Sequence, residues 1–190
     1  KLEKFDFGYG QDQGYASTKG KPLYGEFNAN YYRQQTLPNQ SLTEQEKWNE
    51  AVANDDIDVI AGQGTIAREI ELQCDSLDAV IVSVGGGGLI SGVAGYLKGR
   101  WPEIEVIAAS PSNHAVMIRS LEAGKIIKID PAPTISDGTA GGVEEGSITF
   151  EMCQQFVDHT VLLTEEEINN GIIQLIEKER VLVEGAAGTA

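Results

Sequence analysis

The stretch AVIVSVGGGGLISG, residues 79–92, decides how the whole sequence is interpreted. Its first six residues are mostly β-branched and predict a strand, and residues 89–100 predict a helix that ends at Trp101 and Pro102. Four consecutive glycines join the two elements. Glycine weakens regular structure and supplies no side-chain chemistry, so these residues must serve the chain through their backbone.

Strands and helices alternate along the chain from about residue 51. The apolar patterns predict strands at 79–84, 105–110 and 160–164, and helices at 66–74, 89–100, 115–124 and 165–180. Gly124 is expected to close the third helix and Thr164 to cap the last one, ahead of three acidic residues. This order favours an α/β fold in which a parallel sheet is buried on both faces, a three-layer α/β/α arrangement.

The glycines stand where such a sheet binds its ligands, at the carboxyl end of a strand. Successive N–H groups without Cβ atoms can turn toward one anion, and the start of the following helix adds partial positive charge. A P-loop is disfavoured, because Leu89 and Ile90 stand where Lys and Ser or Thr are required. The dinucleotide pattern fails too, since its third glycine would fall on Ile90 or Ser91. A packing turn alone needs only one or two glycines. We therefore expect a phosphate site built of backbone.

The tetraglycine stretch and three further motifs resemble one family in the same order. The motifs are SVGGGGLISG, DVIAGQGTIAREI (58–70), PTISDGTAGG (133–142) and VLVEGAAGTA (181–190). They resemble the fold type II pyridoxal-phosphate enzymes, in the serine/threonine dehydratase and serine racemase group, over about residues 54–190. Cysteine synthases of the same fold have a G-T-G-G-T loop here. The resemblance implies part of a tryptophan-synthase-β-like fold and pyridoxal 5′-phosphate as cofactor.

The resemblance also implies site residues. The N–H groups of Gly85, Gly86, Gly87, Gly88 and Leu89 would bind the cofactor phosphate. Gly138 would lie near the cofactor, and Glu184 with Gly185 would lie at its pyridine ring. Glu184 interrupts an apolar run, which favours a site over a solvated acid.

Two family motifs are not in the chain, so no catalytic residue is assigned. The lysine that forms a Schiff base with the cofactor lies in an S-F-K-x-R-G-A motif, and an S-x-G-N-H-A loop grips the substrate carboxylate. Lys19, in STKG, resembles the first motif only weakly. Asn54 matches a nucleotide-contacting asparagine of some racemases but has no supporting residues.

No metal site is predicted. Family members that bind Mg²⁺ or Mn²⁺ have acids at the positions of Ser110 and Val116, and neither residue offers a charged oxygen ligand. His114 and His159 are expected to be polar residues rather than ligands.

Composition limits the class of protein. The net charge of −15 disfavours nucleic acid and anionic membranes as partners, so neither is expected. No apolar run approaches the roughly 18 residues that a membrane span needs. Cys74 and Cys153 fit reduced thiols of a cytoplasmic protein. Residues 1–50 are poor in aliphatic side chains and remain an unassigned irregular segment, whereas residues 51–190 are expected to form an incomplete large α/β domain.

Two functions remain open from the sequence. The first is a part of a lyase that deaminates serine or threonine to a 2-oxo acid and ammonia, acts on a small amino acid and forms a homo-oligomer. The missing lysine motif leads us to expect that this chain alone is inactive. The alternative is a non-catalytic module that keeps the phosphate site. Which amino acid is the substrate, and whether lyase or racemase chemistry applies, stay open.

Overall fold

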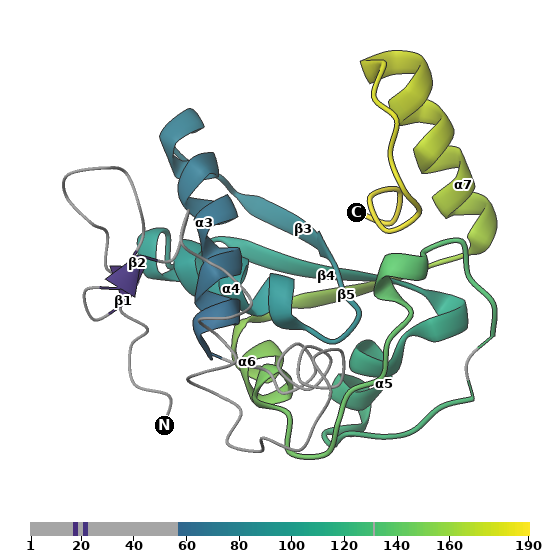
Figure 1. The fold of residues 1–190 in the computed structure, drawn as a ribbon, viewed down its shortest axis with the longest axis horizontal. Coiled ribbons are helices and arrows are strands. Elements are labelled where there is room, and N and C mark those ends of the chain that lie inside the picture. The colour runs from purple at the N-terminus through teal and green to yellow at the C-terminus, as the bar shows by residue number, and fades with distance from the viewer. Residues whose placement is uncertain (1–16, 19–20, 23–56, 131) are drawn as a thin grey trace.

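The computed structural model describes residues 17–18, 21–22, 57–130 and 132–190 (Figure 1). Its strands are β1 (Ser17–Thr18), β2 (Lys21–Pro22), β3 (Ala79–Ser83), β4 (Glu105–Pro111) and β5 (His159–Leu163). Its α-helices are α3 (Ile57–Gln73), α4 (Gly88–Arg100), α5 (Val116–Ala123), α6 (Ile148–Phe156) and α7 (Glu165–Gln174). The shorter helical turns are η1 (Ser112–His114), η2 (Asp137–Thr139) and η3 (Leu175–Glu179).

Strands β3, β4 and β5 form one parallel sheet in that order, which confirms the predicted α/β class. Ile81 pairs with Ile107, and Ile107 pairs with His159. Figure 1 shows α5 and α6 below the strands and α7 with the C-terminal segment above them. β1 and β2 form a separate antiparallel ladder. The carboxyl ends of β3 and β4 therefore open into the loops that precede α4 and α5.

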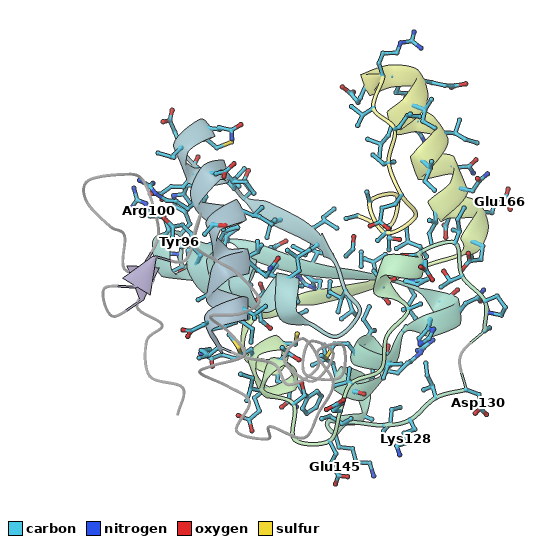
Figure 2. All side chains as sticks on the ribbon, viewed as in Figure 1. Tyr96, Arg100, Lys128, Asp130, Glu145 and Glu166 are labelled. Atoms are coloured by element: carbon cyan, nitrogen blue, oxygen red, sulfur yellow. The ribbon has the colours of Figure 1, made fainter. Side chains whose placement is uncertain are left out.

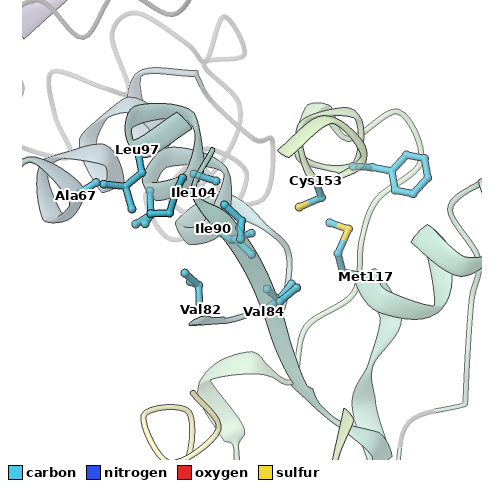
Figure 3. Packing of buried hydrophobic residues seen from close by; sticks show 13 residues of the cluster. Ala67, Val82, Val84, Ile90, Leu97, Ile104, Met117 and Cys153 are labelled. Atoms are coloured by element: carbon cyan, nitrogen blue, oxygen red, sulfur yellow. The ribbon is translucent and has the colours of Figure 1, made fainter. Parts of the chain in front are cut away.

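The core lies between the sheet and α3, α4 and α6 (Figure 3). Helix α4 is its centre, since it packs on α3, α6 and β3. Its Ile90 and Leu97 are almost wholly buried against the sheet residues Val82 and Val106. Because α4 begins with the last glycine of the loop, this packing fixes where the loop sits.

The prediction that the strand at 79–84 is buried on both faces is wrong. Along β3 only Val82 is buried, and Ile81 on the opposite face is 53% exposed. Val161 of β5 is 46% exposed. In the described ranges α3, α4 and α6 pack on the Val82 face, so the second layer of the predicted three-layer arrangement does not cover these side chains. An apolar strand pattern indicates that the residues suit burial, but it does not indicate which part of the protein buries them.

The helix predicted at 66–74 begins at Ile57 instead. Residues 57–65 contain two glycines, which lower helix propensity, and packing overrides this. A Cβ on Gly92 of α4 would lie 2.2 Å from the Ile60 carbonyl oxygen, so the two helices meet at backbone contact. Helix α6 was not predicted, because its sequence, ITFEMCQQF, mixes β-branched and aromatic residues that are poor helix formers.

The predicted helix ends are confirmed at both α5 and α7. Gly124 closes α5 with a φ of 67°, in the left-handed region. Thr164 caps α7 in a capping box with Glu167. The helix predicted at 165–180 is α-helical to Gln174 and continues as the π-helical η3.

Some sequence expectations concern residues outside the described ranges, namely Lys19, Asn54 and most of residues 1–50. In the part of the chain that is described, no helix is both long and apolar enough to span a membrane.

Candidate cofactor site

The tetraglycine loop connects β3 to α4 through one backbone position that favours glycine. Gly87 is the N-cap of α4 and has a φ of 91°, which L side chains rarely adopt. A Cβ there would also lie 2.7 Å from Met117 Cε and 3.1 Å from Cys153 Sγ. The inner side of the loop therefore rests on α5 and α6, whose Met117 and Cys153 lie next to each other in Figure 3.

The outer side of the loop offers free backbone donors. Within the described part of the chain, no hydrogen bond takes up the N–H of Gly85, Gly86 or Gly87. The N–H of Ser91 bonds the Gly87 carbonyl at 3.0 Å, so the N–H groups of Gly88 and Leu89 stand at the unpaired start of α4. Donors of this kind at the positive end of a helix dipole attract an anion.

A cavity of about 410 Å³ lies against these donors. Its lining includes Ser83, Gly85, Gly86, Gly87, Gly88, Leu89, Gly138, Thr139, Glu184, Ala186 and Ala187. The structure thus brings together all the residues that the family resemblance implies, with the exception of Gly185. Gly185 lies behind the wall, where a Cβ would come within 1.8 Å of the Ile135 carbonyl oxygen.

Polar side chains hold the far wall of the cavity. Ser136 Oγ lies 2.7 Å from Thr139 Oγ1, and Thr189 Oγ1 lies 3.1 Å from both Ser136 Oγ and the Gly185 carbonyl oxygen. Ser83 Oγ donates to the Ala186 carbonyl oxygen at 2.6 Å. These bonds join η2 and the C-terminal segment to the end of β3.

Sequence reasoning missed four lining residues: Ser83, Thr139, Ala186 and Ala187. A usable signal existed, because Thr139 follows Gly138 in one recognised motif and the two alanines follow Gly185 in another. Ser83 alternates with Val82 and Val84 along the strand, which points its side chain to the other face.

A second cavity, of about 580 Å³, lies at the opposite end of the strands. It contains Arg100, but also the carboxylates of Asp78, Glu103 and Glu105. Arg100 Nε is already bound to Glu71 Oε1 at 2.6 Å. The larger cavity is therefore a poorer site for an anion.

The positions considered for a metal serve the packing. Ser110 is 1% exposed and donates to the Val84 carbonyl oxygen at 3.1 Å, and Val116 is buried. His114 belongs to η1, and His159 Nε2 is 4.0 Å from Glu105 Oε2 at the start of β5. Among the described residues, no three His, Cys, Asp or Glu side chains gather as they would around a metal ion.

The cavity fits a phosphate-bearing cofactor. A Cβ on Gly88 would meet nothing within 4 Å, and one on Gly86 would meet only the Gly142 carbonyl oxygen at 3.8 Å. Open space thus lies beside these two glycines. The volume beyond them, with Gly138 and Glu184 opposite, leaves room for a ring attached to the phosphate.

Comparison with known proteins identifies the family. A family described as pyridoxal-phosphate dependent enzymes matches residues 25–190, so the match begins inside the segment 1–50 that the sequence left unassigned. L-threonine ammonia-lyase of Thermotoga maritima is 44% identical over 128 residues, 67% of this chain and 32% of the relative. Catabolic L-threonine dehydratase of Escherichia coli is 41% identical over 136 residues, 72% of this chain and 41% of the relative.

Solved structures agree with these relatives. Serine racemase of Dictyostelium discoideum superposes with a TM-score of 0.66 at 39% identity, covering 71% of this chain and 42% of the racemase. The processed form of threonine deaminase isoform 2 from Solanum lycopersicum gives 0.68 at 38% identity, covering 72% and 39%. The chain thus spans less than half the length of these four relatives. It belongs to the family of pyridoxal-phosphate dependent enzymes, with the fold type II architecture that threonine dehydratases and serine racemases share.

Proposed function

We propose that the tetraglycine loop binds the phosphate of pyridoxal 5′-phosphate, and that the protein takes part in the deamination of serine or threonine. The observation that carries the proposal is the set of unpaired N–H groups at Gly85–Leu89, facing a cavity closed by Gly138 and Glu184. The names of the relatives support threonine as the first substrate to test. Serine follows from the racemase neighbour.

The residues of this chain would bind and orient the cofactor. When bound, pyridoxal phosphate supplies the electron sink that makes an amino-acid α-proton removable. The loop would hold its phosphate by backbone donors, which need no reorganisation. Gly138 leaves room beside Glu184, since a Cβ there would come within 3.1 Å of both carboxylate oxygens. We place Glu184 on the ring side of the site, with Gly185 behind it in the wall.

Three finer assignments belong to the same proposal. A homo-oligomer is supported by the exposed Ile81 and Val161 on the sheet. A cytoplasmic location is supported by the free thiols of Cys74 and Cys153. The substrate is a small amino acid, in keeping with the named relatives.

Substitutions at Gly88 test the phosphate site by charge alone. Asp and Asn have nearly the same size, and a side chain at Gly88 begins in open space at the first position of α4. An acid in the first turn stabilises the helix, but it would repel a phosphate about 4 Å away by about 4 kcal/mol at an effective dielectric constant of about 20. Gly88→Asp should bind pyridoxal phosphate at least about a hundredfold more weakly than Gly88→Asn.

The measurement is an absorbance titration with pyridoxal phosphate, with thermal unfolding recorded for both variants. The Asp variant should melt at least as high as the Asn variant while binding far more weakly. Equal affinities would show that the phosphate binds elsewhere and would end the proposal.

A non-catalytic module that binds the phosphate at the same loop is the second candidate. Borohydride reduction after addition of pyridoxal phosphate separates the two. Cofactor fixed to one lysine of the chain supports the enzyme, and fully reversible binding supports the module.

A further inference from the structure

One hydroxyl of α6 forms a hydrogen bond with the tetraglycine loop. Thr149 Oγ1, on α6, donates to the Gly86 carbonyl oxygen at 2.6 Å, and Thr149 is 0% exposed. In a trans peptide the C=O and the following N–H point in opposite directions. The chain has no cis peptide in its described part, so a Gly86 carbonyl directed at α6 turns the Gly87 N–H away from α6. That direction is the cavity, whose lining includes both glycines.

A second hydroxyl fixes the direction of this hydrogen bond. Ser147 Oγ lies 2.7 Å from Thr149 Oγ1. Thr149 has one hydroxyl hydrogen, and a carbonyl oxygen can only accept, so the hydrogen goes to Gly86. Ser147 must then be the donor to Thr149. Ser147 is the N-cap of α6, yet its side chain makes no cap bond.

Within the described residues, no other hydrogen bond reaches the Gly86 carbonyl oxygen. The α-carbon of Gly87 faces Met117 Cε, Cys153 Sγ and Thr149 Cβ, and the first two offer no strong hydrogen bond donor to a carbonyl. A glycine-rich peptide has little intrinsic preference for one orientation, so an external partner decides it.

We infer that Thr149, backed by Ser147, is a positioning residue of the anion site: its hydroxyl holds the Gly86–Gly87 peptide so that the Gly87 N–H points at the cofactor phosphate. The inference rests on the proposed function and names a residue outside the cavity that sets its affinity. Thr149 does not line the cavity. It acts through the orientation of one peptide.

The test replaces the hydroxyl without changing the shape. Thr149→Val removes the donor, and Thr149→Ser keeps it. The matched control is Thr65→Val, since Thr65 Oγ1 makes the same kind of bond, to the Gly62 carbonyl oxygen at 2.8 Å, on α3 and away from the cavity lining. Each protein is titrated with pyridoxal phosphate and with pyridoxal, which lacks the phosphate. The affinity for pyridoxal phosphate divided by the affinity for pyridoxal reports the phosphate site alone. A general loss of stability leaves this ratio unchanged.

Thr149→Val should lower that ratio about tenfold, the effect of losing one well-placed hydrogen bond. Thr149→Ser and Thr65→Val should keep the parent ratio. In the parent and in Thr149→Ser, the Gly87 amide should show a downfield proton shift when pyridoxal phosphate is added, and Thr149→Val should lose this shift.

The outcomes separate this inference from the proposal beneath it. If the parent prefers pyridoxal phosphate to pyridoxal and Thr149→Val keeps the same preference, the inference is wrong and the proposed function stands. If the parent itself shows no preference, the loop binds no phosphate and both fail.

Discussion

The two walls of the cavity are built in opposite ways. The glycine wall is the segment 85–89, and the C-terminal wall is the segment 184–187. The glycine wall rests on buried side chains of α4, α5 and α6, among them Ile90, Met117 and Cys153, each about 1% exposed. The C-terminal wall around Glu184 is held by hydroxyl and carbonyl bonds, and its neighbour Leu182 is 87% exposed. The glycine wall is therefore part of the core, whereas the other wall is attached to it.

This difference suggests that the two walls have different roles in binding. A site that must recognise a phosphate gains from donors fixed before binding, which the core supplies at the glycine wall. A wall held by a few polar bonds can shift at lower cost and belongs to the less stable part of the molecule. We expect substitutions at the glycine wall to change global stability and substitutions at the C-terminal wall to act locally.

The largest effect is expected from Gly87→Ala. Alanine would have to adopt the positive φ of this position, and its Cβ would overlap Met117 Cε. We therefore expect a loss of about 3 kcal/mol in the free energy of unfolding. Gly88→Ala, with nothing within 4 Å of its Cβ, should leave stability unchanged or raise it by less than about 1 kcal/mol. Urea unfolding of both variants measures the contrast. Equal losses would mean that the glycine wall does not rest on the core.

A smaller effect should appear at acid pH through the contact that holds α4 to α3. The hydroxyl of Tyr96 donates to Glu71, and this bond, with those from Arg100 and Arg68, holds the pKa of Glu71 below its ordinary 4.5 despite partial desolvation. Figure 2 shows Tyr96 and Arg100 at the same end of the molecule. A carboxyl with a lowered pKa stabilises the fold above its unfolded pKa, and this stability is lost as the pH falls through the folded pKa.

Glu71→Gln should therefore cost about 1–2 kcal/mol at neutral pH and less below pH 4.5, so its unfolding free energy should fall less steeply with acid than that of the parent. Unfolding curves at several pH values between 3 and 7, spaced about one unit apart, give the comparison. Parallel curves for the two proteins would show that Glu71 does not carry this pH dependence.

The smallest global effect is expected from Thr189→Val at the C-terminal wall. It removes the hydroxyl that lies 3.1 Å from both Ser136 Oγ and the Gly185 carbonyl oxygen. The loss should be about 1 kcal/mol or less, and amide hydrogen exchange should quicken in residues 184–188 but not in α4. Faster exchange throughout α4 would instead show that the two walls open together as one cooperative unit.

The same contrast explains what the sequence could predict. Strand–glycine–helix order, the Gly124 end of α5 and the Thr164 cap of α7 are local patterns, and each is confirmed. The start of α3 and the whole of α6 depend on packing against α4, which local propensity does not report. The exposed face of β3 depends on partners that no strand pattern identifies.

The site residues also divide into those that a local pattern predicts and those that depend on the fold. The glycines could be predicted as site residues, because four in a row indicate a function of the backbone. Thr149 and Ser147 were not predicted, since they lie more than 50 residues from the loop in sequence and carry no motif of their own. Only the folded chain brings their hydroxyls under Gly86.

A crystal structure of the protein with pyridoxal phosphate is the most direct test of the phosphate site. We expect phosphate oxygens within about 3 Å of the backbone nitrogens of the Gly85–Leu89 segment, with the ring toward Gly138 and Glu184. A phosphate bound elsewhere, for example at Arg100 in the second cavity, would show that the tetraglycine loop is not the phosphate site. Loop N–H groups that turn away from the phosphate would show the same.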